Sequence, residues 1–386
     1  MTRNPVSAAS FTHFGYPKDL KSEPTYHSIE ALAHADVLED VFVLDVEQTY
    51  GLNPDLFEVP VPGGKTIPRA FYLAESVVPR LDAREATIRL FDDLASRRVG
   101  SPETLHSFPH LVKTLRAARE AGSTTAVYAS SSHPKHVRSL LVEERERYGL
   151  DADADLDERV QEGFELADYV LYLSEYSGET FREYGVPEDR LLKVGPLAAD
   201  LDAHPATTPP EDEFTVVSVA NMNELKGVQY LLDAWQQLDL PDARLLLCGT
   251  VNDAVRKIVG SEIDDLEGVE HVGYVDDPAD YYERASVLVH PSLTEGFSKT
   301  IAEAMASSVP VVITEHAQRE YVGGGGFVVP IRDPEAIANR LRYLYDNPRE
   351  AREMGERARE IATSNTWSDF SERVKRVHEE ILQREA

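Results

Sequence analysis

The stretch Pro291-Ser-Leu-Thr-Glu-Gly-Phe-Ser-Lys-Thr-Ile-Ala-Glu-Ala-Met-Ala306 decides the fold of this 386-residue chain. It follows the apolar run 287–289, which has the composition of a buried strand. From about Ser298 the stretch becomes a helix, so a strand passes directly into a helix. That succession is the building unit of a parallel α/β sheet.

The same alternation of strand and helix runs along the rest of the chain. Apolar residues at helical spacing predict helices over 227–238 and 335–346. Strands that alternate with helices indicate parallel sheets covered on both faces, so the predicted fold class is α/β. The apolar runs that predict strands are 41–44, 125–128, 169–173, 215–219, 244–248, 287–289 and 309–313.

A linker divides the chain into two domains of similar size. Residues 201–213 contain three prolines, few apolar residues and no periodicity, which is typical of a connection between domains. We therefore predict Rossmann-like domains over 1–200 and 214–364, with ligands in the cleft between them, outside the carboxyl ends of the strands. Residues 365–386 predict a last helix with one apolar stripe, which is expected to pack back on the first domain.

The chain is strongly acidic. Asp and Glu number 68 against 39 Lys and Arg, giving a formal net charge of −29. A nucleic-acid partner is excluded, because phosphate binding needs a basic face. Only ten of the 39 basic residues are lysine. This balance favours the hypothesis of a halophile-like protein that stays soluble in concentrated intracellular salt.

One region departs from the acidic background. Residues 80–119 hold eight basic side chains against five acidic ones. Two interpretations stay open for this region. It is either a solvated helical face or a surface that meets an anionic membrane or a lipid-phosphate acceptor.

The cysteine content and the hydropathy indicate the cellular compartment. The single cysteine, Cys248, excludes an internal disulfide framework and a multi-cysteine zinc site. No apolar run approaches the roughly 18 residues of a membrane-spanning helix, and the first residues lead into no apolar signal segment. We therefore expect a cytoplasmic protein. The acidic run 151–157 lacks the glycine of an EF-hand loop, so calcium binding is not expected.

The candidate site lies in the stretch quoted first. In a helix that begins near Ser298, the amides of Ser298, Lys299 and Thr300 have no partner within the helix. They predict an anion site, with a diphosphate as the obvious ligand. Side chains tilt toward the helix N-terminus, so Glu303 would point there and suit a ribose diol, and Gly296 would let the backbone approach a ligand. The plainer alternative is a capping box from Thr300 to Glu303.

Several strings resemble a known family. Glu295-Gly-Phe-Ser…Glu303-Ala-Met-Ala, followed by Val309-Pro-Val-Val, resembles the E-x7-E segment of glycosyltransferase family four. The resemblance continues through Val219-Ala-Asn-Met-Asn-Glu-Leu-Lys226-Gly227, Val272-Gly-Tyr-Val and Phe327-Val-Val-Pro, and so covers nearly all of the second domain. It implies the two-domain GT-B fold, with the acceptor on the first domain and a nucleotide-sugar donor on the second.

The resemblance implies roles for residues of the second domain. Glu303 would hold the ribose of the donor, and Lys226 would pair with its diphosphate. Glu295, together with the backbone amides near Phe297 and Ser298, would contact the hydroxyls of the donor sugar.

Three histidines of the first domain are further candidates. His106 would sit near the donor sugar across the cleft, while His133 and His13 would lie on the acceptor side. For His106 and His133 a purely structural role, as a hydrogen-bonded loop or core histidine, stays open.

The sequence departs from the family pattern in three places, one of which is Leu197-Ala-Ala-Asp200 where the family has Gly-Val-Asp. Asn221 stands where the family has an arginine that helps to bind the diphosphate, and Lys299 is the residue placed to compensate. Of the family's glycine-rich loop in the first domain, only Gly15 remains. Acceptor binding is therefore the least defined part of the resemblance.

The predicted function is a retaining glycosyltransferase of the hexosyltransferase type. It would move a sugar from a nucleotide-diphosphate sugar to a glycan or lipid-linked acceptor, with peripheral contact to the inner face of the membrane left open. No cofactor and no metal are expected, because Lys226 and the helix amides would stabilise the leaving diphosphate. Two alternatives remain, a non-catalytic GT-B partner protein, which Asn221 favours, and a sugar-nucleotide epimerase on the same fold.

Overall fold

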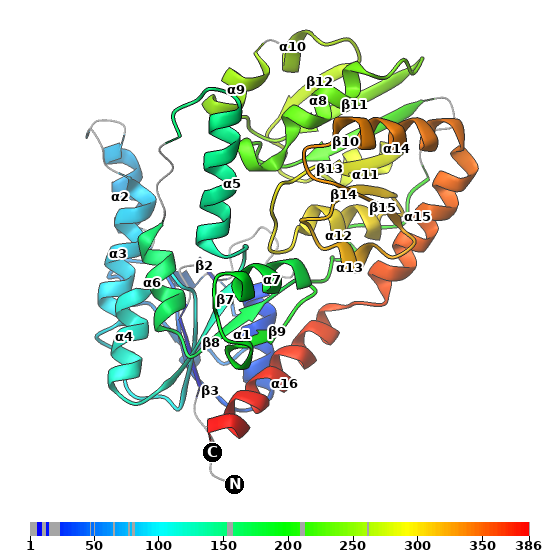
Figure 1. Ribbon diagram of the computed structural model, residues 1–386. Coiled ribbons are helices and arrows are strands. Elements are labelled where there is room, and N and C mark those ends of the chain that lie inside the picture. The colour runs from blue at the N-terminus through cyan, green and yellow to red at the C-terminus, as the bar shows by residue number, and fades with distance from the viewer. Residues whose placement is uncertain are drawn as a thin grey trace.

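The computed structural model describes residues 6–9, 13–14, 24–46, 48–49, 51–64, 66–75, 78, 82–152, 157–208, 213–260 and 262–385. They form two α/β domains, one above the other in Figure 1. The α/β class is confirmed, and each of the seven predicted strands overlaps a strand of the structure. None of the helices in these ranges is long and apolar enough to span a bilayer.

The first domain is built on a seven-stranded parallel sheet with the order β5-β3-β1-β6-β7-β8-β9. Its two faces bury different cores, one under α3, α4 and α6 and the other under α1 and the last helix of the chain. The strands are β1 (Val6–Ala9), β3 (Leu38–Phe42), β5 (Phe57–Glu58), β6 (Thr104–Ser107), β7 (Thr124–Ala129), β8 (Tyr169–Tyr172) and β9 (Leu191–Lys193), with a separate pair β2 (His13–Phe14) and β4 (Asp45–Val46). The helices are α1 (Pro24–His34), α2 (Thr66–Glu75), α3 (Ala83–Ala95), α4 (Val112–Glu120), α5 (Pro134–Arg147), α6 (Glu158–Leu166) and α7 (Glu175–Glu183), with 3-10 turns η2 (Pro54–Leu56) and η3 (Glu188–Arg190).

The second domain is built on a six-stranded parallel sheet with the order β12-β11-β10-β13-β14-β15. The strands are β10 (Phe214–Val219), β11 (Ala243–Cys248), β12 (Val269–Gly273), β13 (Val287–His290), β14 (Val311–Thr314) and β15 (Gly326–Val329). The helices are η4 (Glu224–Lys226), α8 (Val228–Gln236), α9 (Asp253–Val259), α10 (Glu262–Asp265), α11 (Ala279–Arg284), α12 (Lys299–Ala306), α13 (Arg319–Val322), α14 (Pro334–Asp346) and α15 (Pro348–Thr363).

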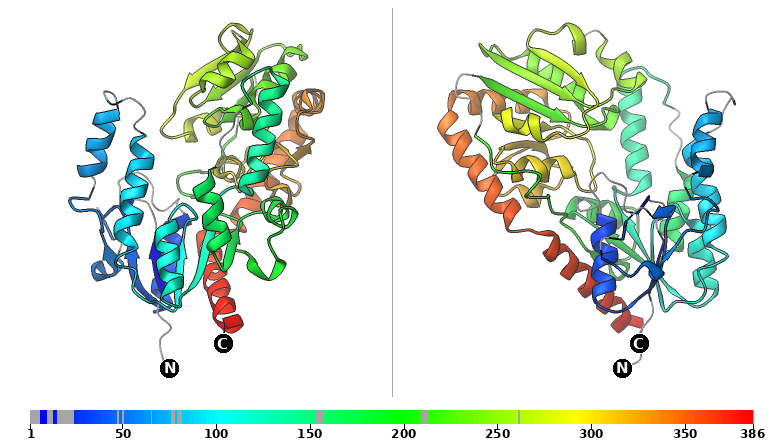
Figure 2. Two further views of the ribbon diagram at one scale, coloured as in Figure 1. Left: turned by 60° about the vertical axis from the view of Figure 1, so that its left-hand side comes forward. Right: turned by 180° about the vertical axis from the view of Figure 1, so that it is seen from behind.

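The last helix, α16 (Trp367–Glu385), leaves the second domain and runs along the first, as Figures 1 and 2 show. Its apolar stripe, which includes Phe370 and Ile381, is buried in a core that continues into the first domain. At its start the ring of Trp367 stacks on His27 of α1 at 4.2 Å. At its end Glu385 accepts a hydrogen bond of 2.7 Å from the Tyr169 hydroxyl. The expectation that this helix packs back on the first domain is met.

The structure does not place His106 in the interdomain cleft. His106 lies on β6, in the middle of the sheet, with 3% of its surface exposed. Its ring packs at 5.5 Å from the ring of His378 on α16, and its Nδ1 lies 3.4 Å from the Tyr128 hydroxyl. The prediction that it sits near the donor sugar is wrong for this structure, because the alternation of side chains along β6 turns it toward α16.

This buried histidine pair predicts a loss of stability at mildly acidic pH. Burial lowers the pKa of His106 to about 3 and that of His378 to about 4, so both rings stay neutral in the folded chain. In the unfolded chain a histidine titrates near about 6.5. Below that pH the unfolded state binds protons that the folded state does not, so stability falls as the pH drops from about 6.5 toward 4.

The measurement is the thermal unfolding midpoint between pH 7 and 4.5. His378→Leu removes one of these neutral buried rings, so its midpoint should fall less steeply with pH than that of the wild type. His34→Leu, at an exposed position on α1, is the matched control and should keep the wild-type slope. Equal slopes for all three proteins would contradict the prediction.

Candidate active site

The candidate site lies where the strand order of the second sheet reverses. The chain passes from β10 to β11 on one side and later returns to β13 on the other side of β10. In open α/β sheets, ligands bind at the carboxyl ends of strands at such a switch point. The loops that follow β10 and β13 therefore form the walls of the site.

These two loops pack as one unit. The Leu293 N–H donates a hydrogen bond of 2.7 Å to the carbonyl of Leu225. Gly227 has a φ of 70°, and a Cβ on it would lie 2.0 Å from the carbonyl oxygen of Pro291. Only glycine allows this approach, which brings the loop that carries Lys226 against the loop that carries Glu295.

Glu295 is the centre of a polar cluster at the end of β13. Its Oε1 accepts from the Lys226 ammonium at 2.5 Å and from the Ser292 hydroxyl at 2.7 Å, and lies 2.8 Å from Nε2 of His290. Burial alone would raise the pKa of the Glu295 carboxyl, but the Lys226 charge and the His290 hydrogen bond hold it below its ordinary value. All three partners converge on Oε1, so among the described residues Oε2 has no hydrogen-bond partner.

The sequence predicted Glu295 and Lys226 and missed His290 and Ser292. Both missed residues lie in the exit of an apolar strand, in the string Val287-Leu-Val-His290-Pro-Ser292. Polar residues that end a buried strand were the available signal.

Helix α12 begins as predicted, with Ser298 as its N-cap and Lys299 as its first residue. However, the prediction that the Ser298 amide is free to bind a ligand is wrong. The Ser298 N–H donates to Oε1 of Gln318 at 2.9 Å, and Nε2 of Gln318 donates back to the Ser298 carbonyl at 2.7 Å. Lys299 and Thr300, the other two first-turn positions, are half-buried.

The capping-box alternative is not seen. Thr300 lies inside α12, because Ser298 is the N-cap, so Thr300 is not the capping residue. Ser298 makes no side-chain hydrogen bond to the helix backbone, and its hydroxyl lies 2.9 Å from the Thr300 hydroxyl. Glu303 accepts a hydrogen bond of 3.2 Å from the hydroxyl of the buried Tyr282, and it is half-buried near the start of the helix. The ribose contact of Glu303 stays a prediction.

Gly296 has a different use from the predicted one. A Cβ there would lie 2.3 Å from the Ser130 carbonyl oxygen of the first domain, so the glycine permits close contact between the domains rather than with a ligand. The neighbouring Ser132 hydroxyl hydrogen-bonds with Thr294 at 2.8 Å. Phe297 turns inward and packs edge-on against Tyr321 at 5.6 Å.

His133 has a structural role in this arrangement. It is the N-cap of α5, where its Nδ1 accepts from the Lys135 N–H at 3.2 Å, and its ring stacks on Tyr184 at 4.8 Å. Burial lowers its pKa to about 4. The prediction that it faces the acceptor is therefore not supported. His13 lies in β2, but its side chain and Gly15 lie outside the described part of the chain.

Asn221 is exposed at the end of β10, and its Oδ1 accepts from the Thr250 hydroxyl at 3.1 Å. It lies in the same β10 loop as Lys226, as the resemblance implied. It carries no charge, so the cationic side chains on this wall are Lys226 and, from α12, Lys299.

Helix α5 of the first domain braces the loop that carries Lys226. Nε of Arg145 lies 3.0 Å from Oε1 of Glu224, and the Asn252 side chain donates to Oε2 of Glu224 at 2.7 Å. Burial would raise the pKa of Glu224, but these hydrogen bonds hold it below its ordinary value. Because Glu224 precedes Lys226 by two residues in the turn η4, the contact fixes the position of the lysine.

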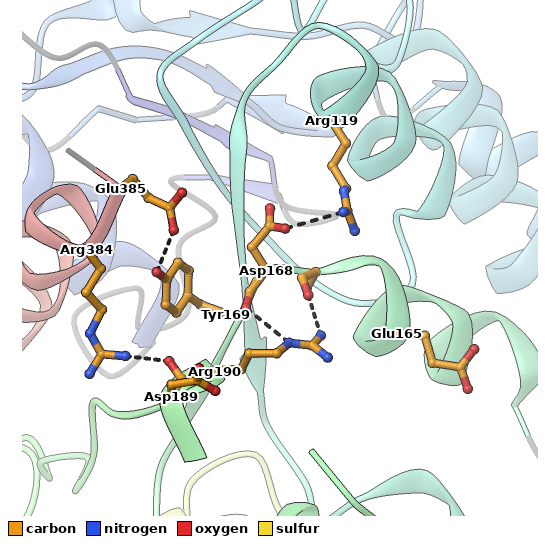
Figure 3. Close-up of a pocket in the computed structure, with 9 residues that line it drawn as sticks. Arg119, Glu165, Asp168, Tyr169, Asp189, Arg190, Arg384 and Glu385 are labelled. Carbon is orange, nitrogen blue, oxygen red and sulfur yellow. Dashed lines mark hydrogen bonds and ion pairs between the residues drawn. The ribbon is translucent and has the colours of Figure 1, made fainter. Parts of the chain in front are cut away.

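Two further observations concern metal ligands and a second hollow. Within the described ranges, no group of three or more His, Cys, Asp or Glu side chains is placed to hold a metal ion. A hollow of about 720 Å³ opens at the amino ends of the first sheet's strands, away from the interdomain loops (Figure 3). Its arginines are engaged with neighbours, for example Arg190 with the Asp168 carbonyl at 3.2 Å and Arg119 with the Asp168 carboxylate at 3.5 Å.

Comparisons with known proteins match the second domain to glycosyltransferases. The family model described as "Glycosyl transferases group 1" matches residues 213–347. A putative glycosyltransferase of Bacillus subtilis, EpsD, is 30% identical over 160 residues, or 39% of this chain and 42% of that protein. The O-antigen chain mannosyltransferase B of Escherichia coli is 30% identical over 216 residues, or 50% of this chain and 55% of that protein. The chain thus spans about half the length of the curated relatives it matches.

Solved structures match over nearly the whole chain. Sucrose-phosphate synthase from Thermosynechococcus elongatus has a TM-score of 0.68 at 19% identity, covering 99% of this chain and 100% of that one. The Anabaena protein HepE in complex with UDP-glucose has a TM-score of 0.65 at 16% identity, covering 97% and 99%. At these identities the likeness shows the fold. The second domain is therefore a group 1 glycosyltransferase domain, and the chain that carries it has the GT-B fold.

Proposed function

We propose that this chain is a retaining glycosyltransferase that moves a sugar from a nucleoside-diphosphate sugar to a hydroxyl of a glycan or lipid-linked acceptor. The observation that carries the proposal is the Lys226–Glu295 pair beside the start of α12, at the switch point of the second sheet. It joins a cation, an acceptor of hydrogen bonds and a helix N-terminus within one site, as a sugar diphosphate requires.

Each group has a task in the proposed reaction. Lys226, Lys299 and the first-turn amides of α12 would hold the diphosphate, and Glu303 would accept hydrogen bonds from the ribose diol. Oε2 of Glu295 would accept from a hydroxyl of the donor sugar. The anomeric C–O bond to the diphosphate breaks while the acceptor oxygen forms the new bond on the same face. The leaving diphosphate takes the acceptor proton, and the site stabilises its charge.

The relatives support the donor class. HepE has been solved with UDP-glucose, and other matching proteins are named as a mannosyltransferase and as a poly(glycerol-phosphate) alpha-glucosyltransferase. We place the reaction in the cytoplasm, in keeping with the lone, buried Cys248. The cationic groups named above would meet the diphosphate charge without a resident metal.

The test is thermal unfolding in molar potassium chloride with UDP, GDP, ADP or dTDP and their sugars. A ligand at 100 times its dissociation constant adds about 2.7 kcal/mol to stability, so one nucleotide should raise the midpoint. Glu303→Ala removes charge-assisted hydrogen bonds of about 1.5–3 kcal/mol. We therefore expect it to weaken binding of that nucleotide by about 10- to 100-fold.

Glu360→Ala, at an exposed position of α15, is the matched control and should bind the nucleotide like the wild type. No midpoint shift with any nucleotide, in folded protein, would favour the non-catalytic GT-B alternative. Conversion of a bound sugar nucleotide without any acceptor would favour an epimerase.

A further inference from the structure

A hollow of about 1470 Å³ lies in the first domain between α3, α4, α5 and α6. We call it the α3–α5 groove, and Figure 1 shows the four helices that form it. Its lining includes seven basic side chains and five acidic ones. The whole chain has 39 basic and 68 acidic residues. The groove therefore reverses the charge balance of the protein, and it contains part of the basic region noted in the sequence.

Cations on two walls of the groove are available to a ligand. Arg84 on α3 and Lys135 on α5 are exposed, and neither forms an ion pair with a residue of the described ranges. Arg89 and Arg116 pair with acidic neighbours, but their side chains are 69% and 54% exposed. Exposed ion pairs contribute little to stability, so an anionic ligand can replace the carboxylate partners.

The groove runs along α5, the helix whose start lies near the loop that carries Glu295. Lys135, Ser139 and Val142 line it along one face of α5, at helical spacing. The same helix starts just after Ser132, whose hydroxyl lies 3.3 Å from the carbonyl oxygen of Glu295 and also contacts Thr294. A molecule in the groove would therefore lie along α5, with one end near the loop that carries Glu295.

We propose that the α3–α5 groove binds the acceptor, and that the acceptor carries at least two phosphate or carboxylate groups away from the hydroxyl that reacts. Two anionic groups match the two walls, with Arg84 on one and Lys135 on the other. The inference rests on the proposed function and adds the charge class of its acceptor. The anionic groups come either from the headgroup of a lipid carrier or from a soluble acidic glycan.

The experiment uses the full chain and two probes. The soluble probe is myo-inositol hexakisphosphate, and the lipid probe is phosphatidylcholine vesicles that contain phosphatidic acid, each compared with an uncharged counterpart at one fixed salt concentration. The groove variant is Arg84→Glu with Lys135→Glu. The control variant is Lys257→Glu with Arg376→Glu, which changes the net charge equally at exposed positions outside the groove.

We expect the groove variant to bind hexakisphosphate at least tenfold more weakly, and the control variant to bind like the wild type. If the groove variant also loses binding to the anionic vesicles, the anionic groups of the acceptor belong to a lipid carrier. If only the soluble probe binds the wild type, they belong to a glycan. Absence of binding by both probes, or equal weakening of binding in the groove variant and the control variant, would overturn the proposal.

Two further measurements keep the result specific. Lys226→Ala should leave hexakisphosphate affinity unchanged, because that lysine belongs to the donor site and not to the groove. The groove variant should keep the nucleotide-dependent midpoint shift, which reports the donor site and shows that the variant is folded. If nucleotide raises the unfolding midpoint of the wild type but neither probe binds, only the proposal for the groove is refuted. If no nucleotide raises the unfolding midpoint of the wild type, the proposed function is refuted. Arg84→Gln with Lys135→Gln is the milder variant if charge reversal disturbs folding.

Discussion

Replacing Lys226 with Ala is expected to slow sugar transfer by about 10²–10³-fold, the effect of losing one group that stabilises transition-state charge. In the proposed reaction this charge develops on the leaving diphosphate. Glu295 keeps its contacts to His290 and Ser292 in the variant, so the buried carboxylate stays hydrogen-bonded and the chain stays folded. The measurement is the rate at which the donor releases its nucleoside diphosphate, with the unfolding midpoint recorded in parallel.

Lys257→Ala is the matched control for this substitution. Lys257 is an exposed lysine of α9 in the same domain, and its removal changes the net charge equally. It should release nucleotide at the wild-type rate. Lys226→Arg keeps the positive charge with a different donor geometry, and we expect an intermediate rate. Equal rates for Lys226→Ala and Lys257→Ala would remove Lys226 from the proposed machinery.

Composition predicts the centre of the second sheet but misses the centre of the first. Strands β10, β11 and β13 read as continuous apolar runs and were predicted. Strands β1 and β6 occupy the middle of the first sheet, yet they read Val-Ser-Ala-Ala and Thr-Leu-His-Ser. All four residues of β6 are buried. Strands buried on both faces of a parallel sheet usually read as near-continuous apolar runs. Strands β1 and β6 depart from that pattern with small and polar residues, so their composition alone does not reveal them.

The candidate site also contains features that the sequence predicted and features that it did not. Local features were predictable, because the helix start at Ser298 depends on its own sequence neighbours. Features that depend on a distant partner were not. The Ser298 amide is occupied by Gln318, twenty residues further on, and Gly296 is placed against Ser130 of the other domain. His106 turns toward a helix that comes 272 residues later in the chain at His378. Spacing along one chain carries no information about such partners.

Contacts between the domains show how the donor loop is held from outside its own domain. Arg319 of α13 makes a two-pronged contact with Glu179 of α7, at 2.6 and 2.7 Å. Near it, the Glu175 N–H donates to Oε1 of Glu320 at 2.7 Å, so Glu320 also joins the domains. With the Arg145–Glu224 pair, these contacts make the second domain's loops depend on the first domain for their position.

Glu144 of α5 is the most deeply buried of these links, and Glu144→Ala is expected to cost about 3 kcal/mol of stability. Its side chain is 0% exposed, and its carboxylate accepts from the Tyr230 hydroxyl at 2.7 Å and from Gln229 at 3.2 Å, besides pairing with Arg332. Removing one member of a buried ion pair costs about 3–5 kcal/mol. The lower end applies here because Arg332 keeps a second carboxylate, Glu143, at 3.0 Å.

Glu143→Ala is the internal control, since Glu143 and Glu144 are neighbours that contact the same arginine. The Glu143 side chain is 50% exposed, and exposed pairs contribute about 0–1 kcal/mol. Calorimetry at fixed salt should therefore show a large fall in the unfolding midpoint for Glu144→Ala and a small one for Glu143→Ala. Because Arg145 follows Glu144 on α5 and holds Glu224, the first variant should also loosen the loop that carries Lys226 and weaken nucleotide binding. Equal midpoints for the two variants would mean that the buried pair does not join the domains in solution.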